Sequence, residues 1–173
     1  MIACKLGPLA DCGARELVQV KSEDTVEWAI VGKSAQGFFP LVLLTGEGTP
    51  RVINLFPDPG DFARYHVAKY GTRYRFAHDP SGPSQIGEGE LFKTAGSLVL
   101  TEDGDWHLLV SSEGQSTLKW LDLATGTIMS ERGSHKMAFG YWNLYIEGLL
   151  EEPSETTLVN NAIPTDACED GDC

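Results

Sequence analysis

Basic and aromatic side chains are concentrated in one short segment of the sequence, residues 62–76, FARYHVAKYGTRYRF. Its fifteen positions hold four Lys or Arg, one His and five Phe or Tyr, in a chain whose formal net charge is −12. Guanidinium groups bind carboxylates and phosphates through paired hydrogen bonds, and tyrosine rings pack against flat or apolar ligands. The segment is therefore the candidate contact site, and the question is which anion it contacts.

Two arginines of this segment are expected on the same face of a strand. If residues 72–78 are extended, Arg73 and Arg75 lie on one face, and Thr72, Tyr74 and Phe76 lie on the other. Neighbouring guanidinium groups repel each other unless a negative charge lies between or opposite them. Three sources of that charge remain open: an Asp or Glu on a neighbouring strand, a partner protein, or a small anion or nucleic-acid backbone.

The C-terminal segment supplies negative charge of the required kind. Residues 151–173 contain seven Asp or Glu and no Lys or Arg. Because this segment repels nucleic acid, nucleic acid is not an expected partner. It complements the basic segment, so either copies of the chain join basic segment to tail, or the tail folds back on its own chain. The predicted partner-contact residues are Arg64, Tyr65, Lys69, Tyr70, Arg73, Arg75, Glu151, Glu152, Asp166, Glu169, Asp170 and Asp172.

No complete catalytic, nucleotide-binding or metal-binding motif is present in the sequence. The stretch VGKS at residues 31–34 lacks the glycine that a phosphate-binding loop needs five positions before Gly32. The four histidines show no compact ligand spacing and are expected at surface or turn positions, and no serine lies in a G-x-S-x-G elbow. We therefore predict no catalytic residue, no metal ion and no cofactor.

The four cysteines lie near the two ends of the chain, at Cys4, Cys12, Cys168 and Cys173. Their spacings, C-x7-C and C-x4-C, differ from the C-x2-C pairs of structural zinc sites. Four reduced thiols are the favoured interpretation, because the N-terminal residues lack the continuous apolar region of a secretory signal. A zinc site or a disulfide that joins the two ends is the alternative.

Short β-rich runs separated by turn signals predict an all-β, mostly antiparallel fold: a sandwich or a barrel with at most one or two short helices. The runs ELVQVK and TVEWAIV are expected to pair as a hairpin, and a later meander turns at Asp103-Gly104. In FGYWNLYIEG, alternation places Trp142, Leu144 and Ile146 on one face. A helix is expected only over residues 61–71, and the Pro- and Gly-rich residues 78–90 are expected to form a long loop.

Length and composition predict one β-rich domain over residues 1–150 and an acidic C-terminal tail over residues 151–173. No apolar run is long enough to span a bilayer, so no membrane contact is expected. The chain is expected to act in the compartment where it is made, the cytoplasm, or in a virus particle if it is a phage component.

These features favour a non-enzymatic function, as a β-rich structural or interaction subunit of a larger protein assembly. A decoration or connector protein of a viral or phage particle is one such subunit, and its partners would be other protein chains, including copies of itself. One alternative is a small ligand-binding or hydrolytic β-barrel, with Arg73, Arg75 and His66 or His78 around an anionic ligand. Another is an acidic inhibitor or immunity-type protein that covers a basic partner surface.

Overall fold

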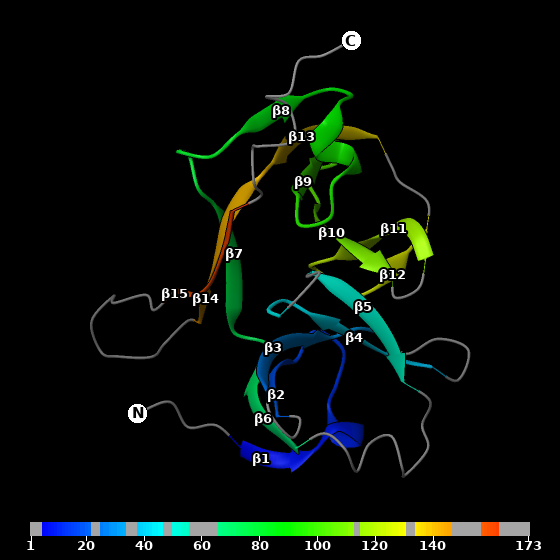
Figure 1. Cartoon of the computed structure of the whole chain (residues 1–173), viewed down its shortest axis with the longest axis vertical. Coiled ribbons are helices and arrows are strands. Elements are labelled where there is room, and N and C mark those ends of the chain that lie inside the picture. The colour runs from blue at the N-terminus through cyan, green and yellow to red at the C-terminus, as the bar shows by residue number, and fades with distance from the viewer. Residues whose placement is uncertain are drawn as a thin grey trace.

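The computed structural model describes residues 5–21, 25–33, 38–46, 50–55, 66–112, 115–130, 134–146 and 157–162. Over these residues the chain is mostly β-strand with mainly antiparallel pairing, and two sheets form a sandwich-like arrangement, not a closed barrel (Figure 1). The predicted all-β fold is therefore confirmed, and the barrel alternative is wrong. Within the described residues, no helix is long and apolar enough to cross a bilayer.

The described residues form fifteen strands and two short 3-10 helices. In chain order these are β1 (Lys5–Pro8), η1 (Leu9–Asp11), β2 (Leu17–Lys21), β3 (Val26–Val31), β4 (Phe39–Leu43), β5 (Arg51–Leu55), β6 (His66–Gly71), β7 (Tyr74–His78), β8 (Ser84–Ile86), η2 (Glu90–Lys93), β9 (Leu98–Thr101), β10 (Trp106–Ser112), β11 (Gln115–Asp122), β12 (Ile128–Met129), β13 (His135–Phe139), β14 (Tyr141–Ile146) and β15 (Thr157–Ala162).

The larger sheet has twelve strands and joins two halves of the chain. Ten strands follow the order β1-β6-β2-β3-β4-β5-β10-β9-β13-β8, and β11 and β12 continue from β10. The two halves meet where β5 and β10 pair in parallel, with Ser111 opposite Arg51 and Ser112 opposite Val52. The smaller sheet has the order β15-β14-β7 and lies beside the larger one (Figure 1).

Side chains that alternate along the strands build the core between the two sheets. Leu17 and Ile30 of the larger sheet pack in one cluster with Trp142, Leu144 and Ile146 of the smaller sheet. Trp142 is fully buried, and its indole N–H donates a 2.7 Å hydrogen bond to the carbonyl oxygen of Gly96. The predicted shared face of β14 is therefore the face that closes the sandwich.

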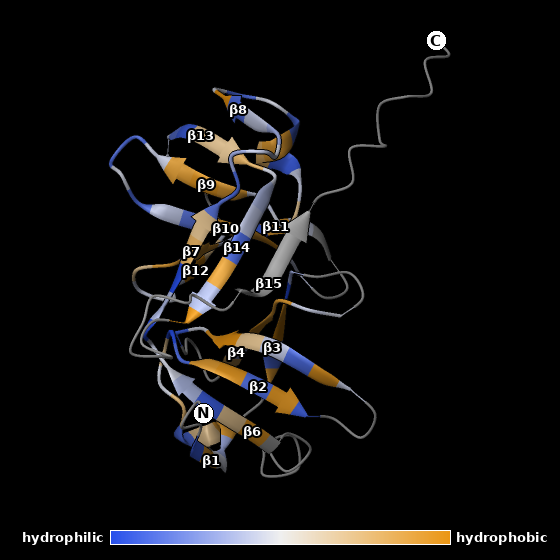
Figure 2. Cartoon of the chain, turned by 90° about the vertical axis from the view of Figure 1, so that its left-hand side faces the viewer, coloured by the Kyte–Doolittle hydropathy of each residue, from blue (hydrophilic) through white to orange (hydrophobic). Residues whose placement is uncertain are grey.

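The opposite face of β2–β5 is also apolar. Val18, Ala29, Leu41 and Ile53 belong to a second buried cluster, so these strands are covered on both sides. In Figure 2 apolar residues accordingly dominate β2 and β4. The predicted hairpin is confirmed within this region, because β2 and β3 pair antiparallel.

The helix expected over residues 61–71 is wrong over the part that the structure describes. Residues 66–71 are β6, which pairs antiparallel with β1 on one side and β2 on the other. Val67 is buried in the second cluster, which a strand between two partners achieves. Long-range pairing therefore outweighs the local capping signals at Asp61 and Gly71. Residues 56–65 lie outside the described residues.

The long loop expected over residues 78–90 is only partly correct. Residues 84–86 form β8, which pairs with β13, and η2 begins at Glu90. The Gln85 side chain accepts a 3.0 Å hydrogen bond from the backbone N–H of Leu91, which ties β8 to η2. The division into a domain over residues 1–150 and a tail over 151–173 stays a prediction. Within that tail, β15 pairs with β14.

Candidate functional site

Four of the twelve predicted contact residues lie in the described part of the chain. These are Lys69 and Tyr70 on β6, Arg73 just before β7, and Arg75 on β7. The other eight lie outside the described residues: Arg64, Tyr65, Glu151, Glu152, Asp166, Glu169, Asp170 and Asp172.

Lys69 and Tyr70 face opposite ways on β6, and both contact their own sheet. The Lys69 ammonium group lies beside the buried thiol of Cys12. Burial, with help from the Glu16 carboxylate, raises the pKa of Cys12 to about 11, and Lys69 opposes that rise. The Tyr70 hydroxyl donates a 3.2 Å hydrogen bond to Gln19 Oε1. Lys69 and Tyr70 therefore have contacts within the fold and do not join the arginines in one cluster.

Arg73 and Arg75 are exposed, whereas Tyr74 between them is buried with 8% of its surface exposed. The predicted alternation is therefore confirmed for Tyr74 and Arg75, whereas Thr72 is exposed like Arg73 because the strand begins only at Tyr74. The Arg75 guanidinium carbon lies 4.8 Å from the ring centre of Tyr145, its cross-strand neighbour, in a cation–π contact. Within the described residues, Arg73 forms no ion pair with a carboxylate. Arg75 lies on β7 and Arg73 lies just before it. β7 is an outer strand of the smaller sheet.

A pocket of about 290 Å³, here called the Arg15 pocket, lies beside β7. Four segments that are far apart in the sequence contribute its walls. The lining residues are Arg15, Tyr74, Arg75, Phe76, Gly104, Asp105, Trp106, Leu123 and Ala124. The pocket thus combines two guanidinium groups, one carboxylate and three aromatic rings.

Arg15 is held in this pocket by an unusual backbone conformation. Its φ of +66° lies in the left-handed region, which costs a residue with a side chain about 1–2 kcal/mol. The backbone N–H donates a 2.7 Å hydrogen bond to the Val31 carbonyl oxygen, which holds Arg15 to β3. Within the described residues, the buried Arg15 Nε has no hydrogen-bond partner and the guanidinium pairs with no carboxylate. A strained residue with an unneutralised charge is typical of a binding site.

Tyr74 is the side chain that contacts the Arg15 guanidinium group. The positive charge of Arg15 lies close enough to the phenol to influence its ionisation. Burial raises the pKa of Tyr74 to about 12, although the Arg15 charge opposes that rise. The phenol is therefore neutral at physiological pH and does not compensate the Arg15 charge.

Two tight turns fix the remaining walls. In the first, the Asp122 carboxylate accepts hydrogen bonds from the N–H of Ala124 at 2.7 Å and from the Thr125 hydroxyl at 2.6 Å. Although partial burial opposes them, these bonds lower the pKa of Asp122. In the second, the Thr101 hydroxyl accepts a 3.0 Å hydrogen bond from the N–H of Asp105. These hydrogen bonds therefore hold two walls of the pocket in place.

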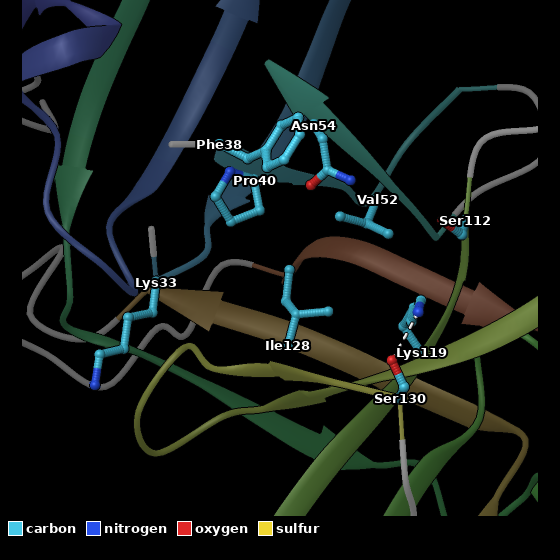
Figure 3. Close-up of a pocket in the computed structure, with 9 residues that line it drawn as sticks. All are labelled: Lys33, Phe38, Pro40, Val52, Asn54, Ser112, Lys119, Ile128 and Ser130. Atoms are coloured by element: carbon cyan, nitrogen blue, oxygen red, sulfur yellow. Dashed lines mark hydrogen bonds between the residues drawn. The ribbon is translucent and has the colours of Figure 1, made fainter. Parts of the chain in front are cut away.

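A second pocket, here called the Lys119 pocket, has a volume of about 270 Å³ and lies between β4 and β5 on one side and β11 and β12 on the other (Figure 3). Pro40, Val52 and Ile128 form its apolar middle, and the Lys33 amine points away from them. The Lys119 amine donates a 2.8 Å hydrogen bond to the Ser130 hydroxyl. The full lining is Lys33, Phe38, Pro40, Val52, Asn54, Ser112, Lys119, Ile128 and Ser130.

Three histidines, His78, His107 and His135, pack against aromatic rings, and the side chain of His66 lies outside the described part of the structure. His107 is buried with 8% exposed, so the expectation of surface or turn positions is wrong for it. The His135 ring stacks between Phe92 and Trp120, with ring centres 4.8 and 5.0 Å apart. The His78 ring stacks on Phe139 at 4.5 Å. The described residues contain no group of three His, Cys, Asp or Glu that could hold a metal ion.

Sequence reasoning found Arg75 but missed Arg15, Asp105 and Trp106. The Asp103-Gly104 signal correctly predicted the turn that precedes Trp106, since Gly104 has a φ of +93°. No local signal indicates that Arg15 reaches the same place, because its neighbours in the sequence show no binding motif.

The comparisons with known proteins identify no relative. No protein-family model matches the sequence, and the curated proteins and solved structures give no significant match.

Proposed function

We propose that this protein is a non-enzymatic structural subunit that assembles with other copies of itself. The cationic surface at Arg73 and Arg75 receives the acidic C-terminal segment of a neighbouring copy. The observation that carries the proposal is the exposed Arg73 side chain, which forms no ion pair within the described residues and lies beside a second exposed arginine.

Charge complementarity supports the choice of the acidic C-terminal segment as the partner of this surface. Residues 163–173 contain four Asp or Glu and no Lys or Arg. A chain that carries both a basic strand and an acidic end can bind another copy head to tail, and such contacts build rings or extended arrays. Arginine and tyrosine, which β7 and its surroundings supply, are also frequent at the energetic centres of protein interfaces.

The edge strands of the larger sheet are a second feature that favours the proposed contacts between chains. Among the described strands, β1 and β8 are the two ends of the ten-strand path. Leu6 on β1 is 83% exposed and Ile86 on β8 is 78% exposed. Outer strands with apolar side chains are places where a second chain can add by strand pairing. A compact acidic β-sandwich of this kind suits a component of a viral or phage particle, such as a decoration or connector protein, an extension based on analogy of architecture.

The proposal is tested by the molar mass of charge-reversal variants of the full chain, measured by light scattering after size exclusion at low salt. Arg73→Glu with Arg75→Glu should shift the wild-type assembly to monomer. Lys21→Glu with Lys136→Glu is the matched control, since it makes the same change in net charge at two exposed strand residues. The control should keep the wild-type mass.

A charge exchange distinguishes the specific contact from a general effect of charge. A second variant replaces four acidic residues of the C-terminal segment: Asp166→Lys, Glu169→Lys, Asp170→Lys and Asp172→Lys. Its C-terminal segment is basic, so this variant should also be monomeric. Mixed with the Arg73→Glu, Arg75→Glu variant, it should form complexes again, because an acidic surface now meets a basic segment. Equal masses for wild type and all variants, or no complex in the mixture, would contradict the proposal.

A further inference from the structure

The Arg15 pocket has the properties of a small-molecule site, a role beyond the proposed assembly. Its volume of about 290 Å³ exceeds the roughly 150 Å³ that a cavity needs to bind benzene, so a ring and one polar group fit. It lies just below the range of about 300–1,000 Å³ that drug-sized ligands occupy. The expected ligand is therefore smaller than a typical drug molecule.

The walls determine the shape of the ligand. Tyr74 and Phe76 lie edge to face with ring centres 6.1 Å apart, and both line the pocket. Trp106 also lines the pocket and lies near Phe139, with ring centres 5.7 Å apart. Aromatic walls that the core holds in place favour a flat apolar body.

The charges determine the polar group of the ligand. Arg15 forms no ion pair within the described residues, and a left-handed backbone sets the direction in which its side chain leaves the main chain. A guanidinium group pairs best with a planar carboxylate, through two parallel hydrogen bonds. Asp105 also lines the pocket, and its negative charge disfavours a doubly charged anion such as phosphate.

We propose that the Arg15 pocket binds a small organic monocarboxylate with a flat apolar body, with the carboxylate at Arg15 and the body against Tyr74, Phe76 and Trp106. Arg75 adds positive charge at the same pocket and remains stacked on Tyr145. Asp105 selects for a single negative charge on the ligand.

The probe for this proposal is phenylacetate, titrated into the full chain and followed by the NMR shift of the Trp106 indole N–H. We expect saturable binding with a dissociation constant in the millimolar range, typical of a ligand of this size. Phenylacetamide, which keeps the shape but lacks the charge, should bind at least about tenfold more weakly, as should acetate, which lacks the ring. Inorganic phosphate should give no saturable shift of Trp106.

Variants assign the binding to this pocket. Arg15→Gln should weaken phenylacetate binding at least about tenfold, and Ala124→Leu should abolish it by filling the pocket. Asp105→Asn should strengthen binding about two- to fivefold, because it removes a repulsive charge. Lys119→Gln, in the other pocket, should leave the affinity unchanged.

Each result supports or overturns the proposal. Equal affinities for phenylacetate and phenylacetamide, full affinity in Arg15→Gln, or no saturable shift in the wild type would overturn it. If Arg15→Gln does not fold, the phenylacetate affinities of Ala124→Leu and Asp105→Asn test whether binding occurs in the Arg15 pocket. Weaker phenylacetate binding in Asp105→Asn would mean that Asp105 does not repel the bound carboxylate, which overturns its assignment as the group that selects a single negative charge. Unchanged assembly of the Arg15→Gln variant would show that this site and the proposed contact between copies are separate.

Discussion

The two pockets of this protein differ little in volume but strongly in how they hold charge. The Arg15 pocket, about 290 Å³, surrounds a guanidinium group that a left-handed backbone fixes and that no carboxylate of the described residues neutralises. The Lys119 pocket, about 270 Å³, has an apolar middle, and its Lys119 amine donates a hydrogen bond to the neighbouring Ser130 hydroxyl. Volume alone therefore does not distinguish a binding site from a gap between packed strands.

The source of this difference lies in the elements that form each pocket. Turns with several internal hydrogen bonds place Ala124 and Asp105 in the Arg15 pocket. Strands that pack through apolar side chains form most of the Lys119 pocket. Rigid turns keep polar groups at fixed positions without a ligand, and such preorganisation reduces the entropy lost on binding. The comparison predicts that changes at the Arg15 pocket have larger effects than equivalent changes at the Lys119 pocket.

The largest effect is expected from adding one methyl group beside Arg15. In Gly126→Ala the new Cβ would lie 3.0 Å from Arg15 Cγ and 3.1 Å from its backbone nitrogen, at a φ of +75°. Crowding and left-handed strain together should lower the free energy of unfolding by about 2–4 kcal/mol. Gly32→Ala is the matched control beside the Lys119 pocket, where the new Cβ would meet Pro40 and Ile128 at 2.9 Å.

The free energy of unfolding of the Gly32→Ala control should fall less, by about 1–3 kcal/mol, because crowding is the only unfavourable effect there. Urea unfolding of both variants and the wild type measures the difference. A greater loss in Gly32→Ala than in Gly126→Ala would contradict the strained arrangement at Arg15.

An alkaline pH should weaken the fold through Tyr74. The pKa of Tyr74 is about 12, above its ordinary value of 10.0, so its stabilising contribution is complete below pH 10 and is lost as the pH rises to 12. This difference corresponds to about 3 kcal/mol. Tyr74→Phe should show a smaller fall in stability over that range, whereas Ser130→Ala should fall as the wild type does.

Unfolding free energies at several alkaline pH values provide this measurement. Cys12, with a pKa of about 11, contributes the same fall to all three proteins. If Tyr74→Phe loses as much stability as the wild type, the buried phenol beside Arg15 is not the group responsible.

A smaller effect is expected from the turn that holds Ala124. Asp122→Asn weakens the charge-assisted hydrogen bonds to Ala124 and Thr125 and should cost about 1 kcal/mol at neutral pH. The lowered pKa of Asp122 means that this stabilisation is present above the pKa of the unfolded chain and is lost as the pH falls. The difference between the variant and the wild type should therefore shrink as the pH falls below the ordinary pKa of an aspartate, about 3.9. A constant difference as the pH falls would assign the loss to shape and not to charge.

The smallest effect is expected at the Lys119 pocket. Ser130→Ala removes an exposed hydrogen bond from the Lys119 amine and should change the free energy of unfolding by less than about 0.5 kcal/mol. Thermal unfolding of Ser130→Ala and of the wild type measures this smallest expected change in stability. A loss above about 1 kcal/mol would show that the Lys119 pocket is as rigidly organised as the Arg15 pocket.

Local patterns in the sequence were sufficient to predict much of the fold. Alternation predicted the shared face of Trp142, Leu144 and Ile146, and all three are buried between the sheets. The same rule predicted the opposite faces of Tyr74 and Arg75. The helix signals at Asp61 and Gly71, in contrast, failed for β6, where pairing with β1 and β2 determines the structure. Such pairings depend on contacts that no local pattern encodes.

The candidate site was only partly predictable for the same reason. Arg75 was found because it belongs to a segment with an unusual local composition. Arg15, Trp106 and Ala124 come from three other segments that meet only after the sheets form. A single sequence does not show that these segments come together in the fold, since none of the three residues belongs to a local binding motif.

The central claim is that positive charge at β7 is held for a negative partner that another molecule supplies. The most direct test is the molar mass of the unmodified full chain, measured by light scattering at about 20 mM and about 500 mM salt, where the screening length falls several-fold. We predict assemblies larger than a monomer at low salt that dissociate at high salt. A monomer under both conditions would contradict the claim.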